Sequence, residues 1–141
     1  MNIYFACSIT GGRSNEPVHQ AITAALMADG HEVPTAHLAG TGIREREGTL
    51  PASEVYERDV AWIRACDLLV AEVSTPSHGV GYEIAFALGL GKPVLCLYHE
   101  SLTISKMISG NSSPGLVVRT YRGTEEAVAT VRAFLGAQTR L

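Results

Sequence analysis

The sequence has little of what marks a membrane protein or a nucleic-acid-binding protein. No apolar run approaches the roughly 20 residues that span a bilayer, and the first residues lack the pattern of a secretory signal peptide. Lys and Arg total 11 against 14 Asp and Glu, a formal net charge of -3, whereas a general nucleic-acid binder presents a basic face. We therefore expect a cytoplasmic protein with no membrane or nucleic-acid partner. A small anionic ligand is still compatible, because a helix N-terminus or one Arg can bind it locally.

Metal-binding and disulfide patterns are also missing. The three cysteines, Cys7, Cys66 and Cys96, are far apart and form no CxxC pair, which is typical of buried, reduced thiols in the cytoplasm. The five histidines show no HExxH or comparable spacing. We expect no metal site and no bound cofactor.

The chain does contain an alternation of strand-like and helix-like segments. With 141 residues, 46% of them apolar, it is expected to fold as one domain over residues 1–141. Apolar runs predict strands near residues 3–7, 31–34, 67–73, 93–98 and 116–121. Helical periodicity predicts helices near residues 16–28, 53–66, 80–90, 104–109 and 124–135.

These strands are continuous apolar runs, which is typical of a parallel sheet covered on both faces. The expected fold is therefore α/β: a three-layer, Rossmann-like (flavodoxin-like) domain with a five-stranded parallel sheet. Between the second strand and the next helix, the polar segment 36–51 is predicted to be a long loop, and such loops are usually functional or disordered.

Glu83 is an acid in an unusual place. An apolar strand over 68–71 ends in polar turn residues, and Gly79 and Gly81 then lead into the apolar helix that carries Glu83. A charge among such neighbours is costly unless compensated, and open α/β sheets bind ligands at this end of their strands. A helix that begins near Val80 places Glu83 in its first turn, where the macrodipole favours the ionised carboxylate. The two interpretations are a functional carboxylate and a simple capping group.

Asp59 is the second unusual acid. On its predicted helix it shares a face with Val55, Trp62 and Ile63, so desolvation should raise its pKa. Taken alone, it is better explained as a structural acid with a backbone or hydroxyl hydrogen-bonding partner. Together with Glu83 it matches the pattern of an acid/base group and a nucleophile in different environments. Tyr4, inside the first strand, must either pack in the core or reach a site.

The turn after the first strand, Ser8-Ile9-Thr10-Gly11-Gly12-Arg13, can bind an anion. Its glycines let backbone N–H groups approach a phosphate, and Arg13 can add a bidentate contact. The turn is neither GxGxxG nor a P-loop, so a dinucleotide or a triphosphate is not indicated. A generic Gly-Gly turn is the alternative. Ser77 can add a hydroxyl donor from the turn before Glu83.

Taken together, these segments resemble the nucleoside 2-deoxyribosyltransferase superfamily. The nearest branch is hydrolytic: the 2'-deoxynucleoside 5'-phosphate N-hydrolases and the CMP N-glycosidases. The resemblance covers most of the chain and is carried by residues 3–13, Asp59 with Trp62, 67–73, 77–83 and 92–97. The Gly-Gly-Arg turn combined with Gly-Val-Gly-Tyr-Glu makes it specific.

The resemblance implies hydrolysis of the N-glycosidic bond of (deoxy)nucleoside 5'-monophosphates. Glu83 would attack the anomeric carbon, Asp59 would help protonate the departing base, and Tyr4 would orient Glu83. The 5'-phosphate would be held by Ser8, Ile9, Thr10, Gly11, Gly12, Arg13, Ser77 and Gly79. The alternatives are a transferase that passes the deoxyribosyl group to another base, and a nucleotide-binding module without catalysis.

The resemblance also implies a homodimer. In the family a polar residue from the neighbouring subunit, located after the fourth strand, closes the phosphate or 5'-hydroxyl site. Residues 109–115 occupy that place here, and Asn111 and Ser113 are the candidates.

Overall fold

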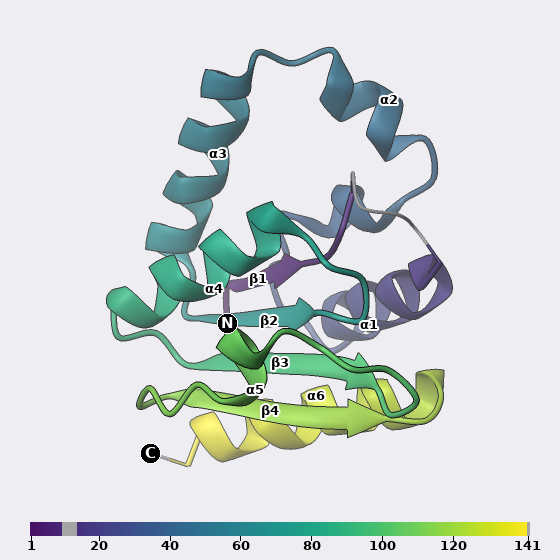
Figure 1. Ribbon diagram of the computed structural model, residues 1–141, viewed down its shortest axis with the longest axis vertical. Coiled ribbons are helices and arrows are strands. Elements are labelled where there is room, and N and C mark those ends of the chain that lie inside the picture. Colours follow the sequence, from purple (N-terminus) through teal and green to yellow (C-terminus); the bar gives the residue numbers. More distant parts are fainter. Residues whose placement is uncertain (10–13, 141) are drawn as a thin grey trace.

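The computed structural model describes residues 1–9 and 14–140 and contains a parallel sheet flanked by helices (Figure 1). The strands are β1 (Ile3–Ala6), β2 (Leu68–Glu72), β3 (Val94–His99) and β4 (Leu116–Tyr121). The helices are α1 (Glu16–Ala28), the short 3-10 helix η1 (Ala36–Ala39), α2 (Ile43–Gly48), α3 (Ala52–Ala65), α4 (His78–Gly89), α5 (Lys106–Ser109) and α6 (Thr124–Gln138).

All pairs of neighbouring strands are parallel, in the order β1-β2-β3-β4. Every residue of β1 and β2 is buried, as the continuous apolar runs predicted. Because the strands are parallel, all their carboxyl ends lie along one edge, which is where ligand sites form in such sheets.

The prediction of five strands is wrong: the described residues form four. The expected second strand is reduced to one parallel bridge between Asn2 and Glu32, on the outer edge of β1. Pro34 has no N–H to continue the ladder, and the chain turns there. The Thr35 hydroxyl instead accepts the Phe5 N–H at 2.9 Å, so the free edge of β1 is satisfied by a side chain.

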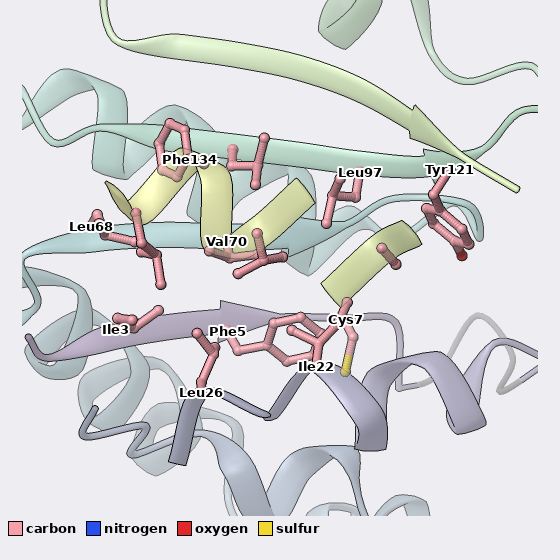
Figure 2. Packing of buried hydrophobic residues seen from close by; sticks show 14 residues of the cluster. Ile3, Phe5, Cys7, Ile22, Leu26, Leu68, Val70, Leu97, Tyr121 and Phe134 are labelled. Carbon is pink, nitrogen blue, oxygen red and sulfur yellow. The ribbon is translucent and has the colours of Figure 1, made fainter. Parts of the chain in front are cut away.

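Two apolar clusters pack on the two faces of the sheet and make the expected three layers. In Figure 1, α4 and α5 pass in front of the sheet and α6 passes behind it. Figure 2 shows the cluster between the sheet and helices α1 and α6, which includes Ile3, Phe5, Ile22, Leu26, Leu68, Val70, Leu97 and Phe134. The cluster on the other face joins α3 and α4 to the sheet and includes Tyr4, Ile63, Leu69, Val80, Ile84 and Ala87.

The segment 36–51, predicted as a loop, contains the two short helices η1 and α2. Leu38, Ala39 and Ile43 are buried, so these apolar side chains fasten a mostly polar segment to the rest of the protein. No helix in the described part of the chain combines the length and the apolar character that a membrane crossing requires.

Candidate active site

Helix α4 begins earlier than the sequence predicted, and this changes the setting of Glu83. The Ser77 hydroxyl caps the helix by accepting the Val80 N–H at 3.3 Å, and His78 is the first helical residue. Glu83 therefore lies in the second turn, beyond the reach of most of the macrodipole effect. Burial raises the pKa of its carboxyl to about 7, so the expectation that the helix favours the ionised form is wrong.

Tyr4 contacts Glu83 from β1. Its ring is buried in the apolar cluster below α4, with 1% of its surface exposed, and its hydroxyl donates a hydrogen bond to the Glu83 carboxylate. This bond lowers the pKa of Glu83, while the nearby charge of Asp59 raises it. Burial, together with these two carboxylates, holds the pKa of Tyr4 itself above its usual range. The tyrosine thus belongs both to the core and to the site.

Asp59 faces the same space from α3. Burial raises the pKa of its carboxyl, as the apolar stripe on its helix predicted, and Arg58 opposes that rise. The Arg58 Nε donates to Asp59 Oδ1 at 2.8 Å. Two acids from different elements are therefore coupled electrostatically across the site.

Arg58 and Glu47 are site residues that the sequence reasoning missed. The Arg58 guanidinium also donates to both Glu47 oxygens, at 2.9 and 3.0 Å, and lies over the Trp62 ring at 4.9 Å. The only sequence signal was the position of Arg58 beside Asp59; its link to α2 depends on tertiary structure.

The site opens into a cavity of about 660 Å³, within the usual size range of small-ligand pockets. Asp59 and Glu83 are among its lining residues. Its wall combines charged groups with apolar side chains from α3, α4 and the segment before α3, among them Arg44, Glu47, Leu50, Val55, Tyr56, Val60, Ile63 and Tyr82. The exposed rings of Tyr56 and Tyr82 lie at its wall with their hydroxyls 3.3 Å apart.

Several of the predicted phosphate-binding residues lie at the same cavity. Ile9, Ser77 and Gly79 line it, and Ser8 is buried next to Ile9. A Cβ at Gly79 would lie 3.6 Å from Glu83 Oε1, so even the smallest side chain there would touch the carboxylate. The predicted residues Thr10, Gly11, Gly12 and Arg13 lie outside the described residues.

Asn111 and Ser113 lie elsewhere, in the turn between α5 and β4. Neither is among the residues that line the cavity of their own chain. The Ser113 N–H donates to Asn111 Oδ1 at 2.8 Å, and both groups are near the surface.

A fully buried carboxylate, Glu72, ends β2 on the other face of the sheet. Its Oε1 accepts the Ser74 N–H at 3.2 Å and the Tyr121 hydroxyl at 3.0 Å, and it also accepts the Ser74 hydroxyl. His19 Nε2 from α1 lies 2.7 Å from Oε2. Glu72 joins α1, β4 and the turn before α4. The sequence reasoning did not single it out, because one acid at the end of an apolar strand resembles an ordinary turn residue.

Comparison with known proteins identifies the family of the chain. The profile of the nucleoside 2-deoxyribosyltransferase family matches residues 3–125. A 5-hydroxymethyl-dUMP N-hydrolase of Mus musculus is 37% identical over 134 residues, 92% of this chain and 76% of the relative. A Methanococcoides burtonii protein, provisionally named 2'-deoxynucleoside 5'-phosphate N-hydrolase 1, is 36% identical over 121 residues, 86% of this chain and 99% of the relative.

A solved structure has the same fold. The CMP N-glycosidase BcmB of Clostridium botulinum superposes with a TM-score of 0.72 at 19% identity, covering 94% of this chain and 98% of that one. The resemblance seen in the sequence is confirmed. The chain belongs to the nucleoside 2-deoxyribosyltransferase family.

Proposed function

We propose that this protein is an N-glycosidase that hydrolyses nucleoside 5'-monophosphates to the free base and a sugar 5-phosphate. The observation that supports it most is the convergence of Glu83, Asp59 and Tyr4, from three elements, beside one cavity at the carboxyl edge of the sheet. The names of the two relatives point to the same reaction class.

In the first step, a Glu83 carboxylate oxygen attacks the anomeric carbon of the sugar. A C–O bond forms, the N-glycosidic bond breaks, and its electron pair leaves with the base. Asp59 donates the proton that neutralises the leaving base. The raised pKa of Asp59 keeps more of this group protonated than an exposed aspartate would be at the same pH.

In the second step, water attacks the same carbon and releases the sugar 5-phosphate. Asp59, now ionised, takes a proton from the water, and the Glu83 carboxylate leaves as the free enzyme is restored. Tyr4 stays hydrogen-bonded to Glu83 in the free enzyme and fixes the direction of its carboxylate. Ionised Glu83 is the attacking form, so its pKa of about 7 sets the acid limit of the reaction.

The 5'-phosphate is assigned to the start of α4 and the turn after β1. Ser77 caps a helix of 12 residues, whose first N–H groups favour an anion. Ile9 and Gly79 line the cavity beside Ser77, and in the sequence Ile9 is followed by Thr10, two glycines and Arg13. The phosphate would thus lie at the start of α4, and the base farther along the cavity, against α2, α3 and the Tyr82 side chain of α4.

The base is assigned to the wall that carries Tyr56 and Tyr82, because aromatic rings stack on bases of any identity. The substrate series to test therefore spans the deoxy and ribo monophosphates of all bases, with 5-hydroxymethyl-dUMP included because a relative is named for it. Free base is measured by chromatography. A substrate without its phosphate should react far more slowly, and equal rates would remove the phosphate assignment.

Transfer of the sugar to a second base is the alternative, since the family is named for that reaction. The assay is repeated with an excess of a free acceptor base. Hydrolysis predicts sugar 5-phosphate as the only sugar product, and a new nucleotide would show transfer instead.

Glu83→Ala separates an enzyme from a binding module, with exposed Glu100→Ala as the matched control. We expect base release by the parent and the control and none by Glu83→Ala. A parent with no turnover, and with the same nucleotide affinity as Glu83→Ala, would identify a binding module.

We further propose that the active form is a homodimer in which Asn111 or Ser113 reaches the neighbouring cavity. The support is that neither residue lines its own cavity and that Leu90 and Met107, beyond the end of α4 and on α5, are exposed at 43% and 83%. Light scattering gives the mass. Mixing inactive Glu83→Ala with Asn111→Ala/Ser113→Ala should restore activity if the subunits share sites, and no recovery would contradict sharing.

A further inference from the structure

Arg58 lies between two carboxylates of the cavity wall, yet the proposed reaction gives it no role. Its Nε donates to Asp59 at 2.8 Å, and its Nη1 and Nη2 donate to the two oxygens of Glu47 at 2.9 and 3.0 Å. The three side chains are only 13–23% exposed, so solvent screens them less than a surface ion pair. The two bonds to Glu47 form a bidentate pair, which fixes the plane of the Arg58 guanidinium.

The bond from Arg58 to Asp59 is not one that a helix makes unaided. Neighbouring residues of an α-helix point about 100° apart and do not face each other. Two interactions turn Arg58 toward Asp59: the bidentate pair of hydrogen bonds to Glu47 of α2, and the packing of its Cζ over the Trp62 ring, 4.9 Å from the centroid. The same Trp62 ring is contacted edge-on by His37 of η1, at 5.8 Å between centroids. The setting of Asp59 therefore depends on segment 36–51.

The charges around Asp59 act in opposite directions. Arg58 lowers the pKa of its carboxyl, whereas burial and the charge of Glu47 raise it. The titratable groups that face Asp59 come from every surrounding element: Arg58 on its own helix, Glu47 on α2, His37 on η1, Glu83 on α4 and Tyr4 on β1. Loss of Arg58 should thus raise the pKa of Asp59. Loss of Glu47 removes a charge that raises this pKa but also releases Arg58, whose effect is larger, so its net result should be a smaller rise.

We propose that Arg58 is a positioning residue for Asp59 and that Glu47 holds it there, so that Asp59 is set for proton transfer only when segment 36–51 is seated on α3. The kinetic part of this inference rests on the proposed function; the geometric part does not. A base that contacts α2 would consequently affect Asp59, the residue that protonates it, through Glu47 and Arg58.

The test uses Arg58→Gln and Glu47→Gln, with Arg64→Gln as the matched control. Arg64 is on the same helix and also lies over a ring, that of Phe86 at 5.4 Å. The midpoint of Asp59 is followed by carboxyl ¹³C NMR against pH. We expect it about half a unit or more higher in Arg58→Gln, higher by a smaller amount in Glu47→Gln, and unchanged in the control.

Kinetics provide the second readout. Arg58→Gln should lower kcat about tenfold or more with KM changed less than about threefold, because Asp59 rather than substrate contact is displaced. Arg58→Lys keeps the charge but cannot form the bidentate pair with Glu47, so its kcat should lie between those of the parent and Arg58→Gln. If thermal unfolding shows that Arg58→Gln does not fold, Arg58→Lys replaces it in the test.

Unchanged Asp59 midpoints in the folded variants would overturn the inference, and so would a lower midpoint in Glu47→Gln, which would show that Arg58 stays on Asp59 without Glu47. The expected shifts in a protein that releases no base would instead support the positioning of Asp59 and reject the proposed reaction.

Discussion

Two carboxylates lie at the same edge of the sheet, on opposite faces, in different surroundings: Glu72 is buried and Glu83 is half-buried. Glu72 is 1% exposed and is met by the Ser74 N–H, by two hydroxyls and by His19. The described residues give Glu83 one donor, the Tyr4 hydroxyl, and leave it beside a cavity of about 660 Å³. A carboxylate whose lone pairs are used holds elements together. One with a single donor and free space beside it is available to a substrate.

The largest expected difference between the two carboxylates is catalytic. Glu83→Gln keeps the shape but cannot form the glycosyl ester, so base release should fall about 10³-fold or more, whereas Glu72→Gln should stay within about tenfold per folded molecule. Initial rates of base release, normalised to folded protein, measure both. Equal losses would mean that Glu72 also serves the reaction.

The next effect is on stability and concerns Glu72. The amide oxygen can replace Oε1 as acceptor, but the NH₂ group then replaces Oε2 opposite His19, and the hydrogen bonds to a carboxylate are lost. Glu72→Gln should therefore lower the free energy of unfolding by about 2 to 3 kcal/mol. Urea denaturation measures this, with exposed Glu125→Gln as a control expected within about 0.5 kcal/mol of the parent. A neutral Glu72→Gln would contradict the structural role.

Glu83→Gln should have the opposite effect on stability. In the parent, the pKa of the Glu83 carboxyl is about 7 in the folded protein and 4.5 ordinarily. The parent therefore loses stability as the pH rises between these two values. Glu83→Gln avoids that loss and should be more stable than the parent by about 1 to 2 kcal/mol at pH 8, but not at pH 4. Unfolding curves at both pH values test it. A destabilised variant at pH 8 would show that ionised Glu83 is better compensated than its surroundings indicate.

The smallest effect concerns Tyr4→Phe, which removes the hydroxyl that donates to Glu83. The hydrogen bond lowers the pKa of Glu83, so without it the acid limb of kcat/KM should move about half a unit or more toward higher pH. Rates between pH 5 and 9 locate the limb. An unmoved limb would mean that it belongs to another group.

Much of the fold followed from periodicity, but tertiary contacts decided the rest. The boundaries of α1 and β4 agree with the prediction because their apolar periodicity is clear. The prediction of the second strand was wrong because Pro34 stops the ladder and the Thr35 side chain accepts the next N–H in its place. No local sequence pattern indicates this replacement. Segment 36–51 was predicted as a loop because it is mostly polar, but burial of Leu38 and Ile43 stabilises the short helices η1 and α2 there.

In the site, the sequence identified the acids but not the groups around them. Glu83 and Asp59 were found because acids in apolar helix faces are conspicuous. The pKa of Glu83 was misjudged because the helix starts at His78 rather than Val80. Arg58–Glu47 joins residues 11 positions apart and on different helices, a pairing that only the folded chain brings about.

The early end of the second strand has a consequence for how such proteins diversify. Since sheet pairing stops before Pro34, the segment 36–51 contributes no ladder hydrogen bond among the described residues, and yet it supplies Arg44, Glu47 and Leu50 to the cavity. Segment 36–51 can therefore be replaced by the corresponding segment of a relative, provided that positions 38, 39 and 43 remain apolar. We expect such a replacement to alter which base is accepted and to leave the sheet and the attacking carboxylate unchanged.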